Sequence, residues 1–159
     1  MDGGVKILTL VFACGLLAGF GVYAIVSSAL PDPVHASLYT ENAPEPIGPY
    51  SQAVRCGDYL FTSGQIGLDP ATGNLPPGTV AGEAVQAMEN LRAILAEAGL
   101  DFSDVVQTRI YLTDLADFDT INAVYGEYFE ESYPARAAVQ VAGLPKGARV
   151  EIEMVAKVR

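Results

Sequence analysis

The sequence has few residues that could bind a metal or form a disulfide. It contains one histidine, His35, in a proline-containing stretch, and two cysteines, Cys14 and Cys56. Cys14 lies in an apolar segment that cannot face the core of a folded domain, so the two cysteines do not predict a disulfide. No group of histidine, cysteine and acidic residues has the spacing of a metal site. We therefore expect neither a metal nor a cofactor.

Basic residues are also scarce. Nine lysines and arginines stand against 19 aspartates and glutamates, which gives a formal net charge of −10 at pH 7. Phosphate binding requires a basic face, and this composition cannot easily supply one. We therefore expect no nucleic-acid partner.

Charge is absent altogether from residues 7–30. As a helix this segment would be about 36 Å long, enough to cross a bilayer core of roughly 30 Å. Lys6 precedes the segment, and no lysine or arginine follows it until Arg55. Because positive residues favour the cytoplasmic side, this pattern predicts a membrane anchor whose following domain lies outside the cytoplasm.

A cleavable signal peptide is the alternative for the same segment. Val34 and Ala36 place small residues where a signal peptidase cuts, whereas the apolar run exceeds the ~7–15 residues of a usual signal core, which favours an uncleaved anchor. In both cases residues 1–36 are predicted to be an anchor or signal segment with a linker, and residues 37–159 a single folded domain. The predicted location is extracytoplasmic, either membrane-anchored or secreted to the periplasm or beyond.

The domain shows alternating β-prone and helical patterns in the order β-β-α-β-α-β-β. Gly57-Asp58 joins the first two strands in a hairpin, and Thr79 and Gly99 bound the first helix. This order predicts an α+β two-layer sandwich, a mixed sheet with two helices on one face. The expected strands are residues 50–56, 59–63, 105–112, 137–142 and 149–158, and the expected helices are residues 80–98 and a second one from about residue 114.

Two charged residues near the C-terminus are candidates for chemistry. Pro134 stiffens the turn before Arg136, which then enters a β-prone segment, a suitable mount for a guanidinium that binds a carboxylate through two hydrogen bonds. Glu151 alternates with buried apolar residues of the last strand and so lies on its polar face. An ordinary surface arginine and a solvated strand face are the structural alternative.

Three further residues suggest ligand contacts. Ser63 and Gly64 end a predicted strand, where a glycine lets the backbone approach a ligand closely, although an ordinary bulge would have the same sequence. Asn122 is a polar amide on the apolar stripe of the second helix. A buried amide needs partners, so Asn122 makes either a structural hydrogen bond or a ligand contact.

Four motifs occur together over roughly residues 43–158. They are G-P-Y-S-Q-A-V, T-S-G-Q-I-x-L-D-P-x-T-G, Y-P-A-R and L-P-K-G-x-x-V-E-I-E. In this order and spacing they resemble the RidA/YjgF family of enamine and imine deaminases. The resemblance implies a chorismate-mutase-like fold and a homotrimer with clefts between subunits.

The resemblance also implies roles for particular residues. The essential arginine of the family corresponds to Arg136, the cleft tyrosine to Tyr50, the Ser-Gly pair to Ser63 and Gly64, the helix asparagine to Asn122 and the water-binding glutamate to Glu151. A departure follows Ile66, where many members have proline and this chain has Gly67. That change leads us to expect a looser cleft entrance.

The implied activity is the hydrolysis of reactive 2-imino and enamine acids, of the 2-iminopropanoate and 2-iminobutanoate type, to 2-oxo acids and ammonia. Arg136 would hold the substrate carboxylate and Glu151 a water, with Tyr50 as a wall of the cleft. The alternative is a non-catalytic, trimeric module that binds small carboxylates at a membrane surface. Such a module needs Arg136 but not Glu151.

Overall fold

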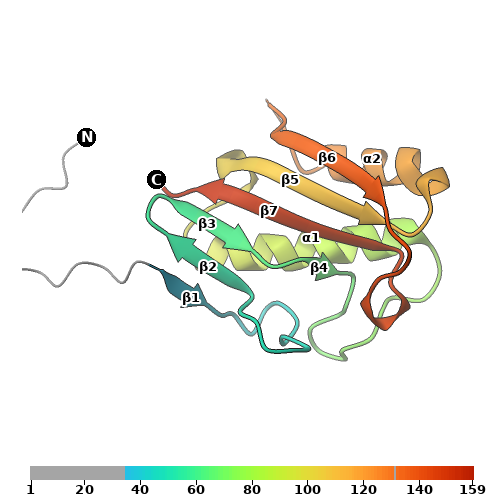
Figure 1. The fold of residues 1–159 in the computed structure, drawn as a ribbon, viewed down its shortest axis with the longest axis horizontal. Coiled ribbons are helices and arrows are strands. Elements are labelled where there is room, and N and C mark those ends of the chain that lie inside the picture. The colour runs from blue at the N-terminus through green and yellow to red at the C-terminus, as the bar shows by residue number, and fades with distance from the viewer. Residues whose placement is uncertain (1–34, 131) are drawn as a thin grey trace, which may run out of the picture. The chain divides into compact units, whose positions relative to one another are not determined.

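The computed structural model describes residues 35–130 and 132–159 (Figure 1). Its strands are β1 Ala36–Leu38, β2 Ala53–Cys56, β3 Tyr59–Thr62, β4 Gln65–Ile66, β5 Val105–Leu112, β6 Ala135–Gln140 and β7 Val150–Lys157. Its helices are α1 Val80–Glu97 and α2 Phe118–Gly126, with short 3-10 helices at Phe102–Asp104, Leu115–Asp117 and Pro145–Gly147.

The strands form one mixed sheet with the order β1-β2-β3-β7-β5-β6, and β4 also pairs with β7. Strands β5 and β6 are parallel, whereas the other pairs are antiparallel. Both helices cover the same face of the sheet (Figure 1). The predicted two-layer α+β fold is therefore confirmed. The short strands β1 and β4 were not predicted, because two or three residues are too few to show a period.

Helix α1 supplies most of the core opposite the sheet. The Thr79 hydroxyl accepts a hydrogen bond from the Gly82 N–H at 3.3 Å and caps the helix, as the sequence predicts. Gly99, with φ +71°, ends it in the left-handed conformation that glycine tolerates best. Between these ends Met88 and Leu91 are fully buried. The core therefore forms where an apolar helix stripe meets the inner sheet face.

Strand β7 lies inside the sheet and pairs with β3, β4 and β5. Its side chains alternate strictly between the two faces. Val150, Ile152 and Met154 are buried against the helices, whereas Glu151 and Glu153 are only partly buried on the opposite, outer face. The predicted alternation of this strand is confirmed.

The connection after β4 packs tightly against α1. A Cβ atom at Gly67 would lie 2.5 Å from the backbone oxygen of Glu83, so only glycine fits. Asn90 of α1 donates hydrogen bonds to the carbonyls of Ile66 and Leu68 at 3.2 and 2.9 Å. Gly67 therefore lets this connection pack directly against α1.

A partly buried ion pair holds the start of β7 against the same helix. Both Glu83 carboxylate oxygens accept hydrogen bonds from Arg149, one from its backbone N–H at 2.7 Å and one from its Nε at 2.8 Å. A third bond runs from Arg149 Nη2 to the Gly78 carbonyl at 2.8 Å. Since Glu83 is only 4% exposed, removing Arg149 would leave a buried charge without its partner.

The predicted extracytoplasmic location, membrane-anchored or secreted, is contradicted and withdrawn. That prediction rested on the apolar run of residues 7–30 and on the charges that flank it, and this run lies outside the described residues. Within residues 35–130 and 132–159, no helix combines the length and hydrophobicity needed to cross a membrane. The 18-residue helix α1 includes Glu83, Glu89 and Arg92, and such charges are costly in hydrocarbon.

Replacing Gly67 with alanine is expected to lower the free energy of unfolding by about 1–3 kcal/mol, because the new methyl group would overlap the α1 backbone. Urea unfolding followed by circular dichroism measures this change. Gly82→Ala is the matched control. There the added Cβ meets nothing nearer than 3.9 Å, and alanine should stabilise the helix by about 0.5–1 kcal/mol. Equal unfolding midpoints for Gly67→Ala and the parent protein would contradict the close approach.

Candidate active site

Arg136 lies on the edge strand β6 and faces the helices. Its register partner on β5 is Thr108, which is fully buried. The guanidinium carbon lies 4.8 Å from the ring centroid of Tyr125 and 5.8 Å from that of Phe118. Aromatic faces attract a guanidinium without using its N–H groups. The two rings of the α2 region therefore hold the fork while leaving its donors available.

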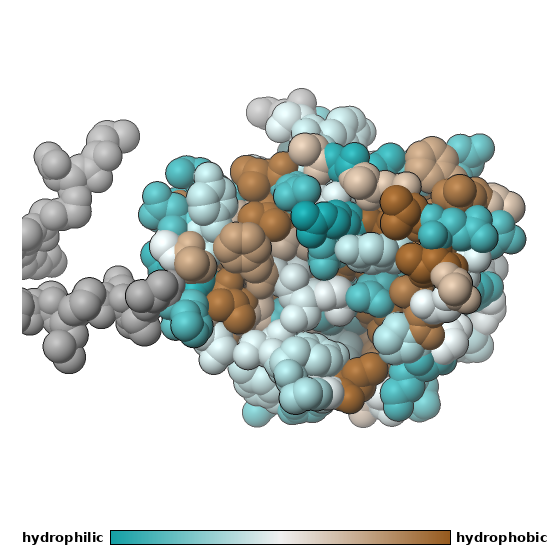
Figure 2. Space-filling model, viewed as in Figure 1, coloured by the Kyte–Doolittle hydropathy of each residue, from teal (hydrophilic) through white to brown (hydrophobic). Residues whose placement is uncertain are grey.

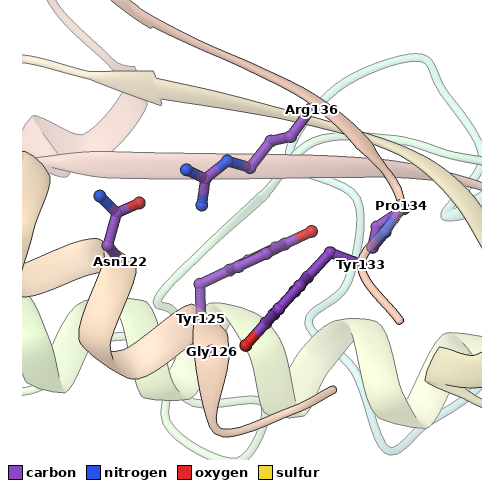
Figure 3. Close-up of a pocket in the computed structure, with 6 residues that line it drawn as sticks. All are labelled: Asn122, Tyr125, Gly126, Tyr133, Pro134 and Arg136. Carbon is purple, nitrogen blue, oxygen red and sulfur yellow. The ribbon is translucent and has the colours of Figure 1, made fainter. Parts of the chain in front are cut away.

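A cavity of about 310 Å³ opens beside this guanidinium. Figure 3 shows the Arg136 fork and the Asn122 amide turned toward each other, with the Tyr125 ring beneath them. Asn122 is half-buried, and no hydrogen bond joins its side chain to the described part of the chain. Of its two predicted roles, this placement favours ligand contact. The cavity is lined by Asn122, Tyr125, Gly126, Tyr133, Pro134 and Arg136.

The other predicted site residues gather where β3 runs into β4. A Cβ atom at Gly64 would lie 1.9 Å from a carboxylate oxygen of Glu151, so glycine is required for Glu151 to occupy its position. Ser63 next to it donates a hydrogen bond from its hydroxyl to the Ser51 carbonyl at 2.6 Å. The glycine at this corner thus makes room for the Glu151 side chain, rather than for a ligand alone.

Tyr50 lies close to the same corner. Its ring is 45% exposed and borders a small cavity that Gly64 also lines. Its hydroxyl accepts a hydrogen bond from the backbone N–H of Ile47 at 3.1 Å, which fixes the ring against the preceding loop. We call Tyr50, Ser63, Gly64 and Glu151 the corner group, and Arg136 with Asn122 the arginine group.

The two groups lie on opposite faces of the sheet. Arg136 pairs with Thr108, and Thr108 pairs with the buried Met154, so all three point toward the helices. Glu151 is an odd number of residues from Met154 on the same strand and points the other way. A small molecule bound by Arg136 therefore cannot reach the Glu151 of the same chain.

The surroundings of Glu151 favour the protonated form of its carboxyl group. Burial raises its pKa above the ordinary value of 4.5, and the negative charge of Glu153 on the same face raises it further. No hydrogen bond from the described residues counteracts this shift. Glu151 therefore suits the role of a proton acceptor that also orients a water molecule.

The sequence alone did not single out Tyr125 or Tyr133 as site residues. The structure places both rings in the wall of the arginine cavity (Figure 3). Tyr125 is buried, and its hydroxyl and that of Thr108 are 3.1 Å apart. Tyr133 is 69% exposed at the cavity edge. The spacing of Tyr125, one helical turn after Asn122, was a usable signal, since residues i and i+3 share a helix face.

These features define a small α+β domain with an arginine-lined cavity of the size that small molecules occupy. A family model described as Endoribonuclease L-PSP matches residues 40–158. The chain therefore belongs to the endoribonuclease L-PSP family, which is the RidA/YjgF family. The resemblance seen in the sequence motifs is confirmed.

Individual relatives agree with this assignment. A Bos taurus protein named 2-iminobutanoate/2-iminopropanoate deaminase is 54% identical over 123 residues, a match that covers 77% of this chain and 90% of that protein. The crystal structure of the E. coli YjgF gene product is 46% identical with a TM-score of 0.74, covering 78% of this chain and 99% of that one. E. coli TdcF, solved with bound serine, is 44% identical with a TM-score of 0.75 and the same two coverages.

Replacing Tyr125 with leucine should weaken the binding of a small carboxylate such as pyruvate. Loss of the ring removes a cation–π contact, which corresponds to a rise in Kd of about two- to thirtyfold. Titration calorimetry on the folded variant measures the change. Tyr125→Phe keeps the ring and loses only the hydroxyl, so its Kd should stay near that of the parent. Equal affinities for the leucine and phenylalanine variants would show that the ring does not position Arg136.

Proposed function

We propose that this protein hydrolyses reactive 2-imino and enamine acids, of the 2-iminopropanoate and 2-iminobutanoate type, to 2-oxo acids and ammonia. The name of the Bos taurus relative supports the activity. The observation that carries the proposal is the presence of two groups that could act on a substrate. Arg136 has N–H donors that face a cavity, and the Glu151 carboxylate receives no hydrogen bond from the described residues. An imino acid has a carboxylate one bond from its C=N carbon. A site that hydrolyses it therefore needs a group that binds the carboxylate and a group that orients the attacking water.

In the proposed mechanism Arg136 binds the substrate carboxylate by two parallel hydrogen bonds, and Asn122 contacts the same end. Glu151 orients a water and accepts its proton as the oxygen attacks the C=N carbon. The nitrogen takes up a proton to give a carbinolamine, which loses ammonia and leaves the 2-oxo acid. Orientation supplies most of the acceleration, because such imines already hydrolyse in water.

A complete site requires two chains. Arg136 and Glu151 lie on opposite faces of one sheet, so a neighbouring copy must bring its corner group to the arginine group of the first chain. The outer sheet face also exposes apolar side chains, among them Phe61 at 46% and Val139 at 47%. Burial of this face against further copies would remove apolar surface from water. We propose a homotrimer with its sites between subunits, formed by the domain of residues 37–159.

The non-catalytic module that binds small carboxylates is the second candidate function. Its predicted location at a membrane surface is no longer part of it. It would use Arg136 equally well but gives Glu151 no purpose. The requirement that residue 64 be glycine, so that the Glu151 carboxylate fits, favours the enzyme. The RNA cleavage in the family's description is disfavoured for this chain by its net charge of −10.

Arg136→Ala should abolish the acceleration of imine hydrolysis, with a fall in kcat/KM of at least about a hundredfold, because the carboxylate loses a charge-assisted, bidentate partner. An amino-acid oxidase generates 2-iminopropanoate in situ, and the loss of imine is followed with and without protein. Arg92→Ala is the matched control, since Arg92 also contacts two aromatic rings but lies elsewhere. A folded parent protein that binds pyruvate without accelerating hydrolysis would favour the binding module.

The activity should fall on the acid side at a pH above 4.5, the ordinary value for a glutamate carboxyl. Glu151 must be ionised to accept a proton, and its raised pKa means that it becomes protonated at a higher pH than an exposed glutamate would. A kcat/KM profile from pH 4 to 9 measures this limb. Glu151→Gln should lower kcat by about a hundredfold or more and abolish the limb. An unchanged limb in that variant would remove Glu151 from the mechanism.

A further inference from the structure

The outer face of the sheet carries two glutamates two residues apart on β7. Figure 2 shows this face with hydrophilic and apolar side chains intermixed. In the register of β5 and β7, Tyr111 is opposite Glu151, and Arg109 is opposite Glu153. The mechanism uses one of these two carboxylates and gives no part to the other.

Cross-strand contacts distinguish the two glutamates. Arg109 Nη1 donates a hydrogen bond to Glu153 Oε1 at 2.5 Å, and the Tyr111 hydroxyl donates to the same oxygen at 3.4 Å. Glu151 lies against Gly64 and receives no hydrogen bond from the described residues. One carboxylate is therefore neutralised by a guanidinium, and the other is left for solvent or a substrate.

Two carboxylates at this spacing compete for protons. Alternate residues of a strand are about 6–7 Å apart on one face, close enough for one negative charge to oppose the ionisation of the other. The side chains of Arg109 and Glu153 are 50% and 27% exposed, so their ion pair adds little to the stability of the fold. Its main consequence is that the charge of Glu153 opposes the ionisation of Glu151 less strongly.

We propose that Arg109 is a positioning residue for Glu151: by pairing with Glu153 it keeps Glu151 the one available, ionised carboxylate of this face. The inference deepens the proposed function and rests on it. Glu153 acts on Glu151 even while paired, since its charge contributes to the raised pKa of Glu151. Without Arg109 the full charge of Glu153 would face Glu151 and oppose its ionisation more strongly.

Besides Glu153, the titratable groups of the described chain near Glu151 are Glu45 and Tyr50, which border the small cavity that Gly64 lines, and Tyr111. Tyr111 is opposite it on β5, and burial together with the charge of Glu153 raises the pKa of that hydroxyl, so it stays neutral near pH 7. Lys157 lies at the far end of β7, about 20 Å along the strand, where its ammonium is 5.7 Å from the Tyr59 ring centroid. Strand β6 contributes only apolar side chains to this face beside Glu151. Arg109 is thus the cation of this face that forms an ion pair with one of the two glutamates.

The test compares the pH profiles of three full-length variants with that of the parent protein. Arg109→Gln should move the acid limb of kcat upward by about half to one pH unit, which lowers kcat about three- to tenfold on the acid side. KM should change little, because the substrate carboxylate is bound by Arg136, which lies on the other face of the sheet from Arg109. Adding Glu153→Gln to Arg109→Gln removes the competing charge and should restore the limb. Lys157→Gln removes a cation from the same face at a distance and should leave the profile unchanged.

A second readout separates this proposal from the proposed function. In protein labelled with ¹³C at the glutamate side-chain carboxyls, the Glu151 signal is assigned from its loss in Glu151→Gln and titrated directly, with no need for turnover. A higher titration midpoint of the Glu151 signal in Arg109→Gln, reversed by adding Glu153→Gln, supports the role of Arg109 even if no imine is hydrolysed. Superimposable titrations of the parent and Arg109→Gln, or a loss of kcat at every pH that Glu153→Gln does not reverse, would overturn it.

Discussion

Strand β7 has to serve two faces at once, and the arrangement of both candidate groups follows from this constraint. Its even-numbered side chains, from Val150 to Ala156, complete the core beneath α1, and this burial fixes the register of the neighbouring strands. Glu151 must then point outward, toward the corner formed by Gly64. Arg136, whose partner Thr108 belongs to the core face, must point inward. The sheet itself separates the arginine from the glutamate, so the proposed chemistry is inseparable from assembly.

The scarcity of cations makes the placement of each arginine informative. Arg92, Arg109, Arg149 and Arg159 each form an ion pair with a carboxylate of the described chain. Arg136 instead lies over aromatic rings, in a protein with ten more negative than positive charges. Aromatic contacts hold a guanidinium without supplying a carboxylate. Arg136 thereby lies beside the cavity without a carboxylate partner among the described residues.

Patterns within single elements were enough to predict much of this fold. The capped helix α1 and the alternation along β7 depend on side chains a few residues apart, so hydropathy and turn residues reveal them directly. The short strands β1 and β4 depend on pairing with distant segments and leave no local pattern. The apolar run of residues 7–30 is long enough to span a membrane, but length alone does not show that it does. The extracytoplasmic location predicted from it was wrong.

The sequence by itself determined the family, the two-layer fold and the identities of Arg136, Asn122, Ser63, Gly64, Tyr50 and Glu151 as candidates, because motifs and periodicity are properties of neighbouring residues. Only the tertiary structure decided how these residues are grouped. Strand register set Arg136 and Asn122 on one face and the corner group on the other. It also showed that Gly64 makes room for a glutamate side chain and that Tyr125 supports the guanidinium. Which side chains meet across a sheet depends on pairings between segments far apart in the chain, and no local pattern encodes them.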